Sequence, residues 1–165
     1  MATATLTPTK LDRPLDALNV SRRAEIIRDL NTALATNLDL HLVAKHAHWN
    51  VKGPNFQGLH ALFDTIADGA REYADLVAER AVALGGMAMG THEELAANSA
   101  LPRFVANERH WEPLVKGVHE RVLAAADQAR AFAAHLDDDL ATQDIYVELI
   151  RGLDKWAWML EAHLG

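Results

Sequence analysis

Hydrophobic residues recur three and four positions apart over most of the chain, the spacing that places them on one face of an α-helix. Four such stretches cover residues 21–49, 55–84, 111–135 and 141–163. We expect Ser21 to cap the first. At about 1.5 Å per residue, four helices of this size are typical of a four-helix bundle.

The connections between these stretches contain recognisable helix-breaking and capping residues. Gly53 and Pro54 form a short turn after the first helix. Thr91 and Glu94 have the spacing of a capping box, which predicts a short extra helix between the second and third long helices, closed by Pro102. The predicted fold is therefore all-α: residues 1–14 form a flexible N-terminal tail and residues 15–165 one helical domain.

Composition narrows the class of protein. The chain has 165 residues and no cysteine, which excludes disulfides, thiolate metal sites and cysteine nucleophiles. It has no apolar run long enough to span a membrane and no signal peptide, so we expect a cytoplasmic protein without a membrane partner. The net charge of −7 disfavours general nucleic-acid binding and suits a protein that concentrates cations, and nine histidines offer metal ligands.

The second helix carries the candidate chemistry. Its apolar side chains, from Leu59 through Ala70 to Leu84, lie within roughly 100° of one another and predict a core stripe. Polar residues on the opposite side form two i,i+4 pairs, His60 with Asp64 and Asp75 with Glu79. Because Asp64 and Asp75 are about 16 Å apart along the helix, either each pair is a separate half-site or a second chain completes each one.

Two copies of this helix, packed antiparallel about a two-fold axis, would form complete sites. His60 would then meet Glu79 of the second copy, and Asp64 would meet its Asp75. The residues predicted at this two-fold interface are small or oppositely charged: Asp68, Gly69, Ala70 and Arg71.

His48, at the end of the first helix, folds back towards His60 across the short turn. Two imidazoles and three carboxylates suit Fe(II), Mn(II) or Zn(II), and clustering the carboxylates without a cation would be costly. The alternative interpretation is a solvated face with an ordinary Arg71–Asp75 ion pair. Ala61, Ala78 and Val82 interrupt that face and argue for a buried contact.

The runs KHAHWNVKGPNFQGLHALFD (45–64) and DLVAERAVALGG (75–86) closely resemble the Dps family, the mini-ferritins, as does nearly all the chain after the tail. The resemblance implies a ferritin-like bundle, a dodecameric shell built from two-fold dimers, and a dinuclear ferroxidase centre between subunits. Fe(II) and hydrogen peroxide are the implied substrates, and ferric mineral is stored inside. The family's ligand pattern falls on His48, His60, Asp64, Asp75 and Glu79, and Trp49 is implied near the centre, in addition to core packing.

Acidic residues near the start of the fourth long helix are candidates for a pore through which Fe(II) enters the shell. We predict Asp139, Asp144 and Glu148 in this role; the alternative for Asp139 is helix capping. Of the remaining histidines, we expect His41 to be a satisfied interior or interface residue, with a further metal ligand as the alternative, and His46 to be exposed.

Two other functions remain open. The first is a nucleoid-associated protein that binds and protects DNA. The resemblance implies that many Dps proteins do not bind DNA, and that those that do often use a basic tail. This tail has only Lys10 and Arg13, offset by Asp12, so we expect weak DNA binding at most. The second is a cage or dimer in which the metal sites are purely structural.

Overall fold

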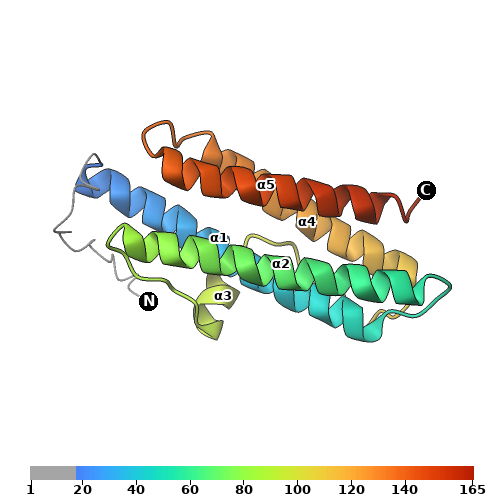
Figure 1. Cartoon of the computed structure of the whole chain (residues 1–165). Coiled ribbons are helices and arrows are strands. Elements are labelled where there is room, and N and C mark those ends of the chain that lie inside the picture. Colours follow the sequence, from blue (N-terminus) through green and yellow to red (C-terminus); the bar gives the residue numbers. More distant parts are fainter. Residues whose placement is uncertain (1–17) are drawn as a thin grey trace.

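A computed structural model describes residues 18–165 of the chain. It contains four long helices and one short one: α1 (Val20–Asn50), α2 (Phe56–Ala83), α3 (His92–Asn98), α4 (Trp111–Ala133) and α5 (Leu140–Glu161) (Figure 1). The predicted all-α bundle with an extra short helix between the second and third long helices is therefore confirmed. The predicted tail, residues 1–14 with Lys10 and Arg13, lies outside the described residues.

Side-chain caps fix where several helices begin. The Asn19 Oδ1 atom accepts a hydrogen bond from the backbone N–H of Arg22 at 2.9 Å, so α1 begins at Val20 and the predicted Ser21 cap was wrong. Thr91 caps α3 as predicted, through its hydroxyl oxygen and the backbone N–H of Glu94. Asp139 caps α5 in the same way.

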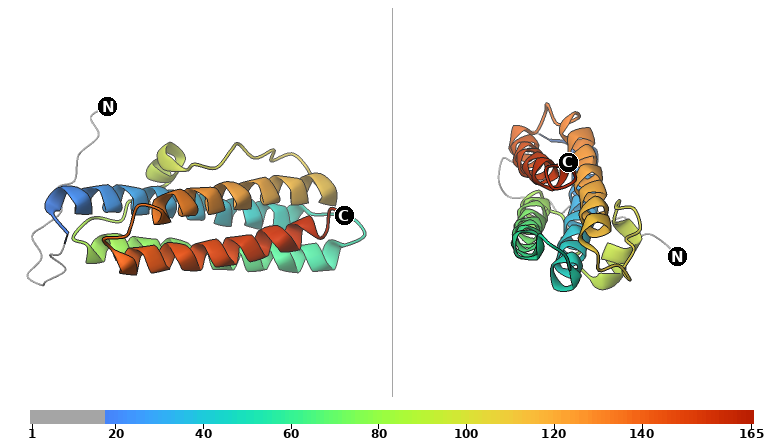
Figure 2. Two further views of the ribbon diagram at one scale, coloured as in Figure 1. Left: turned by 90° about the horizontal axis from the view of Figure 1, so that it is seen from above. Right: turned by 90° about the vertical axis from the view of Figure 1, so that its right-hand side faces the viewer.

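The helices pack as two antiparallel hairpins, α1 with α2 and α4 with α5 (Figures 1 and 2). A long crossover between α2 and α4 carries α3 and returns the chain to the end of the bundle where α1 meets α2. Arg121 of α4 holds the crossover in place, because its buried guanidinium donates hydrogen bonds to the carbonyls of Pro102 and Arg103. The crossover begins only after α2 ends, so both predicted half-sites lie along one continuous helix.

One hydrophobic core fills the bundle. The predicted stripe of α2 lies in it, with Leu59, Phe63, Ile66, Ala70 and Val77 fully buried. Leu62 and Tyr73 are only partly buried at its edge. Among residues 18–165, no helix combines the length and the apolar character that crossing a membrane requires.

Candidate metal centre

Two histidines stack where α1 turns into α2. The rings of His48 and His60 have centroids 3.6 Å apart with an interplanar angle of 22°. His48 Nδ1 lies 2.7 Å from the carbonyl oxygen of His60, and His60 Nδ1 lies 2.8 Å from the carbonyl oxygen of His48. These two reciprocal hydrogen bonds hold both rings in fixed orientations.

The hydrogen bonds also settle which ring nitrogen carries the proton. A backbone carbonyl can only accept, so the Nδ1 atom of each imidazole must be the donor. In the neutral imidazole the lone pair is then on Nε2, which is the arrangement that second-sphere carbonyls impose on metal-binding histidines. In the neutral form, His48 and His60 therefore each keep an Nε2 lone pair that could bind a metal.

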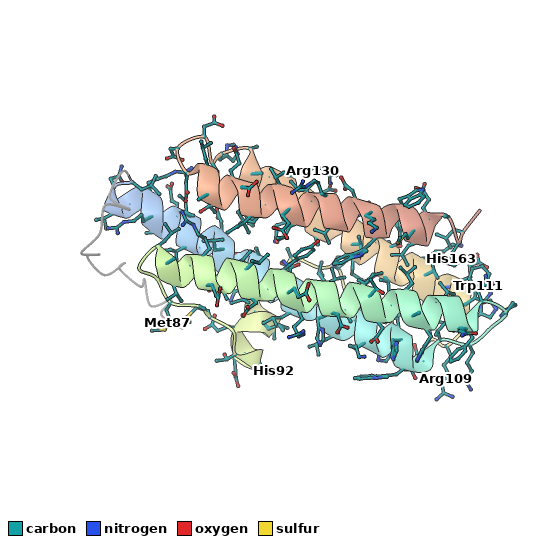
Figure 3. The ribbon with its side chains drawn as sticks, in the orientation of Figure 1. Met87, His92, Arg109, Trp111, Arg130 and His163 are labelled. Atoms are coloured by element: carbon teal, nitrogen blue, oxygen red, sulfur yellow. The ribbon has the colours of Figure 1, made fainter. Side chains whose placement is uncertain are left out.

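The turn that positions these rings depends on one glycine. Gly53 has a φ of 141°, and a Cβ atom there would lie 2.5 Å from Trp111 Cδ1. The backbone of Lys52 bonds to Arg109 and to Trp111, which ties the turn to the start of α4 (Figure 3). Because a side chain at position 53 would both strain the backbone and strike the indole, the geometry of the histidine pair rests on this glycine.

Asp64 lies one helical turn after His60, beside the pair. Its Oδ1 atom is 3.7 Å from His48 Nδ1 and 2.6 Å from the Lys45 ammonium nitrogen. The hydrogen bond from Lys45, and to a smaller degree the nearby His48, keeps the pKa of Asp64 below its ordinary value. Asp64 is therefore an ionised carboxylate that is paired with the Lys45 ammonium group. Its side chain is 43% exposed.

Lys45 is a residue that the sequence interpretation missed. Its ammonium nitrogen also lies 5.8 Å from the centroid of the Trp49 ring. That indole is 68% exposed, so the prediction that Trp49 also packs in the core was wrong for the single subunit. The available signal was spacing, since Lys45 precedes His48 by three residues and Trp49 by four.

The second predicted half-site, Asp75 and Glu79, is exposed on the outer face of α2. Asp75 lines a groove of about 300 Å³ with Leu34, Leu38, Arg71 and others, and Glu79 lines an adjacent hollow with Val82 and Ala88. Within residues 18–165, no three His, Asp or Glu side chains come together as a complete metal site. The subunit alone therefore presents two separate half-sites.

The residues predicted at the two-fold interface have different surroundings within the subunit. Asp68 and Arg71 are exposed, and in the described part of the chain neither forms an ion pair, so the alternative Arg71–Asp75 pair is not made. Ala70 is fully buried in the subunit's own core, and a Cβ on Gly69 would lie 2.4 Å from Trp156 Cζ2. Ala70 therefore serves packing within the subunit and its assignment to the interface was wrong, whereas Gly69 is partly exposed and its assignment stays a prediction.

The three predicted pore residues have different surroundings. Asp139 is buried, receives hydrogen bonds from Arg80 at 2.8 and 3.0 Å, and caps α5 through Thr142, so it is a structural carboxylate and the pore prediction was wrong for it. Asp144 and Glu148 are exposed one turn apart on α5. They remain candidates for the pore.

The other histidines near the centre are bonded elsewhere. His41 Nδ1 lies 2.8 Å from the carbonyl oxygen of Ala67, as expected for a satisfied interior histidine. His46 was expected to be exposed; it is partly buried instead, and its Nε2 atom lies 2.9 Å from the carbonyl oxygen of Ala106 in the crossover. Neither ring joins the His48–His60 pair.

Comparison with known proteins places these features in a family. Residues 27–165 match the family described as "Ferritin-like domain". The "DNA protection during starvation protein" of Agrobacterium fabrum is 35% identical over 158 residues, covering 94% of each chain. Its counterpart from Mycolicibacterium smegmatis is 33% identical, covering 91% of this chain and 82% of that protein.

Solved structures give the same result. DpsA14 from Streptomyces coelicolor superimposes with a TM-score of 0.89 at 31% identity, covering 98% of this chain and 95% of that one. A Dps from Microbacterium arborescens "in the high iron form" has a TM-score of 0.82 at 32% identity, covering 94% and 99%. The chain therefore belongs to the Dps family of ferritin-like proteins.

Proposed function

We propose that this protein oxidises Fe(II) at a centre formed between two subunits and stores the ferric product within a hollow shell. One subunit supplies His48, His60 and Asp64, and its two-fold mate supplies Asp75 and Glu79. The observation that carries the proposal is the His48–His60 pair, whose backbone hydrogen bonds leave both Nε2 lone pairs available to a metal.

The exposed face of α2 supports a second subunit as the source of the missing ligands. An antiparallel copy brings the acidic half-site of one chain level with the histidine half-site of the other. It also sets Asp68 against Arg71 of the second copy, both without ion pairs in the described part of the subunit. Burying Asp75 and Glu79 in this contact is favourable only if a cation joins them.

Two imidazoles and three carboxylates form a ligand set suited to Fe(II), with Zn(II) and Mn(II) as ions that could occupy it. Hydrogen peroxide accepts two electrons, and two bound Fe(II) ions supply them while two protons complete the formation of water. The protein's residues bind and orient these substrates and need supply no nucleophile. Consuming Fe(II) and peroxide together limits the release of hydroxyl radicals.

The shell that we propose is a dodecamer. Asp144 and Glu148 on the exposed side of α5 would line a negatively charged pore that attracts Fe(II), consistent with the net charge of −7. The relative from Microbacterium arborescens was solved in a high iron form, which supports iron as the cargo.

DNA protection is the second candidate function. The names of the relatives from Agrobacterium fabrum and Mycolicibacterium smegmatis favour it. The acidic charge of this chain opposes it, and only Lys10 and Arg13 make the tail basic. Retardation of plasmid DNA that disappears on deletion of residues 1–14 and weakens with added salt would support this function.

The proposed function is tested by mixing Fe(II)-loaded, oxygen-free protein with hydrogen peroxide and following ferric absorbance. We expect rapid oxidation with iron kept in solution by the shell, and a fall to the protein-free rate in Asp75→Asn/Glu79→Gln. Asp137→Asn/Glu161→Gln removes the same charge from exposed positions away from the centre and should behave as wild type. Equal rates in all three proteins and in buffer would overturn the proposal.

A further inference from the structure

A tyrosine and a tryptophan form an aromatic pair between α2 and α5. The ring centroids of Tyr73 and Trp156 are 5.4 Å apart with an interplanar angle of 36°, within the range of interacting aromatic rings. Trp156 is 6% exposed, whereas Tyr73 is only partly buried. The pair thus extends from the bundle interior towards the surface. It lies between α2 and α5, which run side by side in the bundle (Figure 2).

Two glycines provide the space that this pair occupies. A Cβ atom on Gly69 would lie 2.4 Å from Trp156 Cζ2, and one on Gly152 would lie 1.7 Å from the Tyr73 hydroxyl oxygen. Glycine inside a helix costs up to about 1 kcal/mol relative to alanine. Each helix therefore has a glycine where it meets the aromatic pair. Trp156 packs against the backbone of α2 at Gly69, and the Tyr73 hydroxyl packs against the backbone of α5 at Gly152.

The pair lies close to the candidate centre, on the other side of the same helix. Gly69, which Trp156 contacts, is five residues after Asp64 and six before Asp75, or about 7–9 Å along α2 from each. Trp156 therefore touches the α2 backbone between the two half-sites. An electron leaving the pair for either half-site would have to cross only the width of one helix.

The chain contains two tyrosines, and their hydroxyl groups differ. A phenol that loses an electron at neutral pH also loses its proton, so it needs an acceptor. The Tyr146 hydroxyl is buried and has no hydrogen-bond partner in the described residues. Tyr73 is only partly buried, at the edge of the core. Tyr73 is therefore the tyrosine that can pass its proton to water.

We propose that Tyr73, acting through Trp156, donates one electron to the centre when peroxide meets a single bound Fe(II). Peroxide then receives one electron from Fe(II) and one from Tyr73. Reduction of peroxide by two electrons gives two hydroxide ions, and the proton that the phenol passes to water neutralises one of them. The products are Fe(III), a neutral Tyr73 radical, one water molecule and one hydroxide ion. The O–O bond breaks without release of a hydroxyl radical. This inference rests on the proposed function.

The test uses the assembled protein loaded with less than one Fe(II) per subunit, mixed with excess hydrogen peroxide and frozen within milliseconds for electron paramagnetic resonance. We expect a tyrosyl radical in wild type that is absent in Tyr73→Phe and retained in Tyr146→Phe. Each phenylalanine keeps the ring and removes only the hydroxyl, so packing is preserved. Trp156→Phe should slow the appearance of the radical severalfold while iron oxidation proceeds.

The outcomes separate this inference from the proposed function. If the wild-type protein oxidises Fe(II) faster than buffer does but forms no tyrosyl radical, Tyr73 is not the donor although the ferroxidase stands. The same holds if the radical survives in Tyr73→Phe and disappears in Tyr146→Phe. If peroxide does not oxidise Fe(II) faster than in buffer, the proposed function itself fails. Mass spectrometry of the chain after turnover adds a second readout: Tyr73→Phe should accumulate more oxidised side chains around the centre than Tyr146→Phe does.

Discussion

Near each end of α2, one of its side chains forms a salt bridge with another part of the subunit, and the two salt bridges differ in burial. Near the start, Asp64 bonds to Lys45 at 2.6 Å with side-chain exposures of 43% and 23%. Near the end, Arg80 bonds to Asp139 at 2.8 Å with exposures of 13% and 5%, and Thr142 bonds to both partners. The buried pair joins α2 to the start of α5, whereas the exposed pair can exchange its cation. Burial decides which carboxylate is available to a metal.

Breaking the buried pair should have the largest effect on stability. Asp139→Ala leaves the Arg80 guanidinium buried without its partner and removes the cap of α5, so we expect a loss of about 3–5 kcal/mol in the free energy of unfolding. Urea denaturation of the metal-free protein measures it. Asp137→Ala, two residues away and exposed, should change this free energy by less than about 0.5 kcal/mol. Similar losses in both variants would contradict the difference between the pairs.

Substitution of a glycine in the middle of α2 should have the next largest effect on stability. Gly69→Ala places a methyl group against Trp156, and we expect overpacking to cost about 1–3 kcal/mol. Gly58→Ala is the matched control, because nothing lies within 4 Å of its Cβ position in the subunit, and it should gain up to about 1 kcal/mol from better helix propensity. Thermal unfolding distinguishes the expected loss of stability in Gly69→Ala from the expected gain in Gly58→Ala. A stable Gly69→Ala would show that the Trp156 contact is not tight.

Acid should weaken the buried pair over a defined range. Burial alone would raise the pKa of Asp139, but hydrogen bonds from Thr142 and Arg80 outweigh it and lower this pKa. The stabilisation is thus fully present above the ordinary aspartate pKa, near pH 4, and is lost as the pH falls through the lowered value. The thermal midpoint of wild type should exceed that of Asp139→Asn at pH 7, with a difference that narrows below pH 4. A difference that stayed constant down to pH 2 would rule out this linkage.

Removing the exposed pair should have the smallest effect on stability. Lys45→Met should change the free energy of unfolding by less than about 1 kcal/mol, as for other surface ion pairs. Because Asp64 then no longer shares its carboxylate with an ammonium group, we expect tighter binding of Fe(II) in an oxygen-free titration. Lys116→Met, which breaks the exposed pair with Glu112, serves as the control and should leave Fe(II) affinity unchanged. Unaltered affinity in Lys45→Met would show that Lys45 does not compete with the metal.

The helices and the pattern of the site were predictable because both are local in sequence. Hydrophobic spacing defined the four long helices, and the i,i+4 pairs on α2 identified the two half-sites. The short turn after α1 indicated that His48 would approach His60, which the structure places in stacking contact. The reciprocal hydrogen bonds that orient the two rings depend on the turn geometry and could not be read from spacing.

The wrong predictions concern features set by tertiary contacts. A pattern of small residues at Gly69 and Ala70 does not say whether the close neighbour is a second subunit or Trp156 of the same chain. Asp139 follows two other aspartates, and only its contact with Arg80 distinguishes it from an exposed pore residue. Lys45 is similarly unremarkable in sequence until α1 and α2 pack and bring it to Asp64.

The most direct test of the inter-subunit centre is to co-express two inactive variants, His48→Ala/His60→Ala and Asp75→Asn/Glu79→Gln. In a mixed dimer one centre carries all four changes and the other carries none. Because about half of the dimers in a random mixture are mixed and each has one intact centre, we expect about one quarter of the wild-type rate of Fe(II) oxidation. Each variant expressed alone should remain at the protein-free rate. Mixed shells as inactive as their parents would show that a single subunit must supply every ligand, and would contradict the proposed centre.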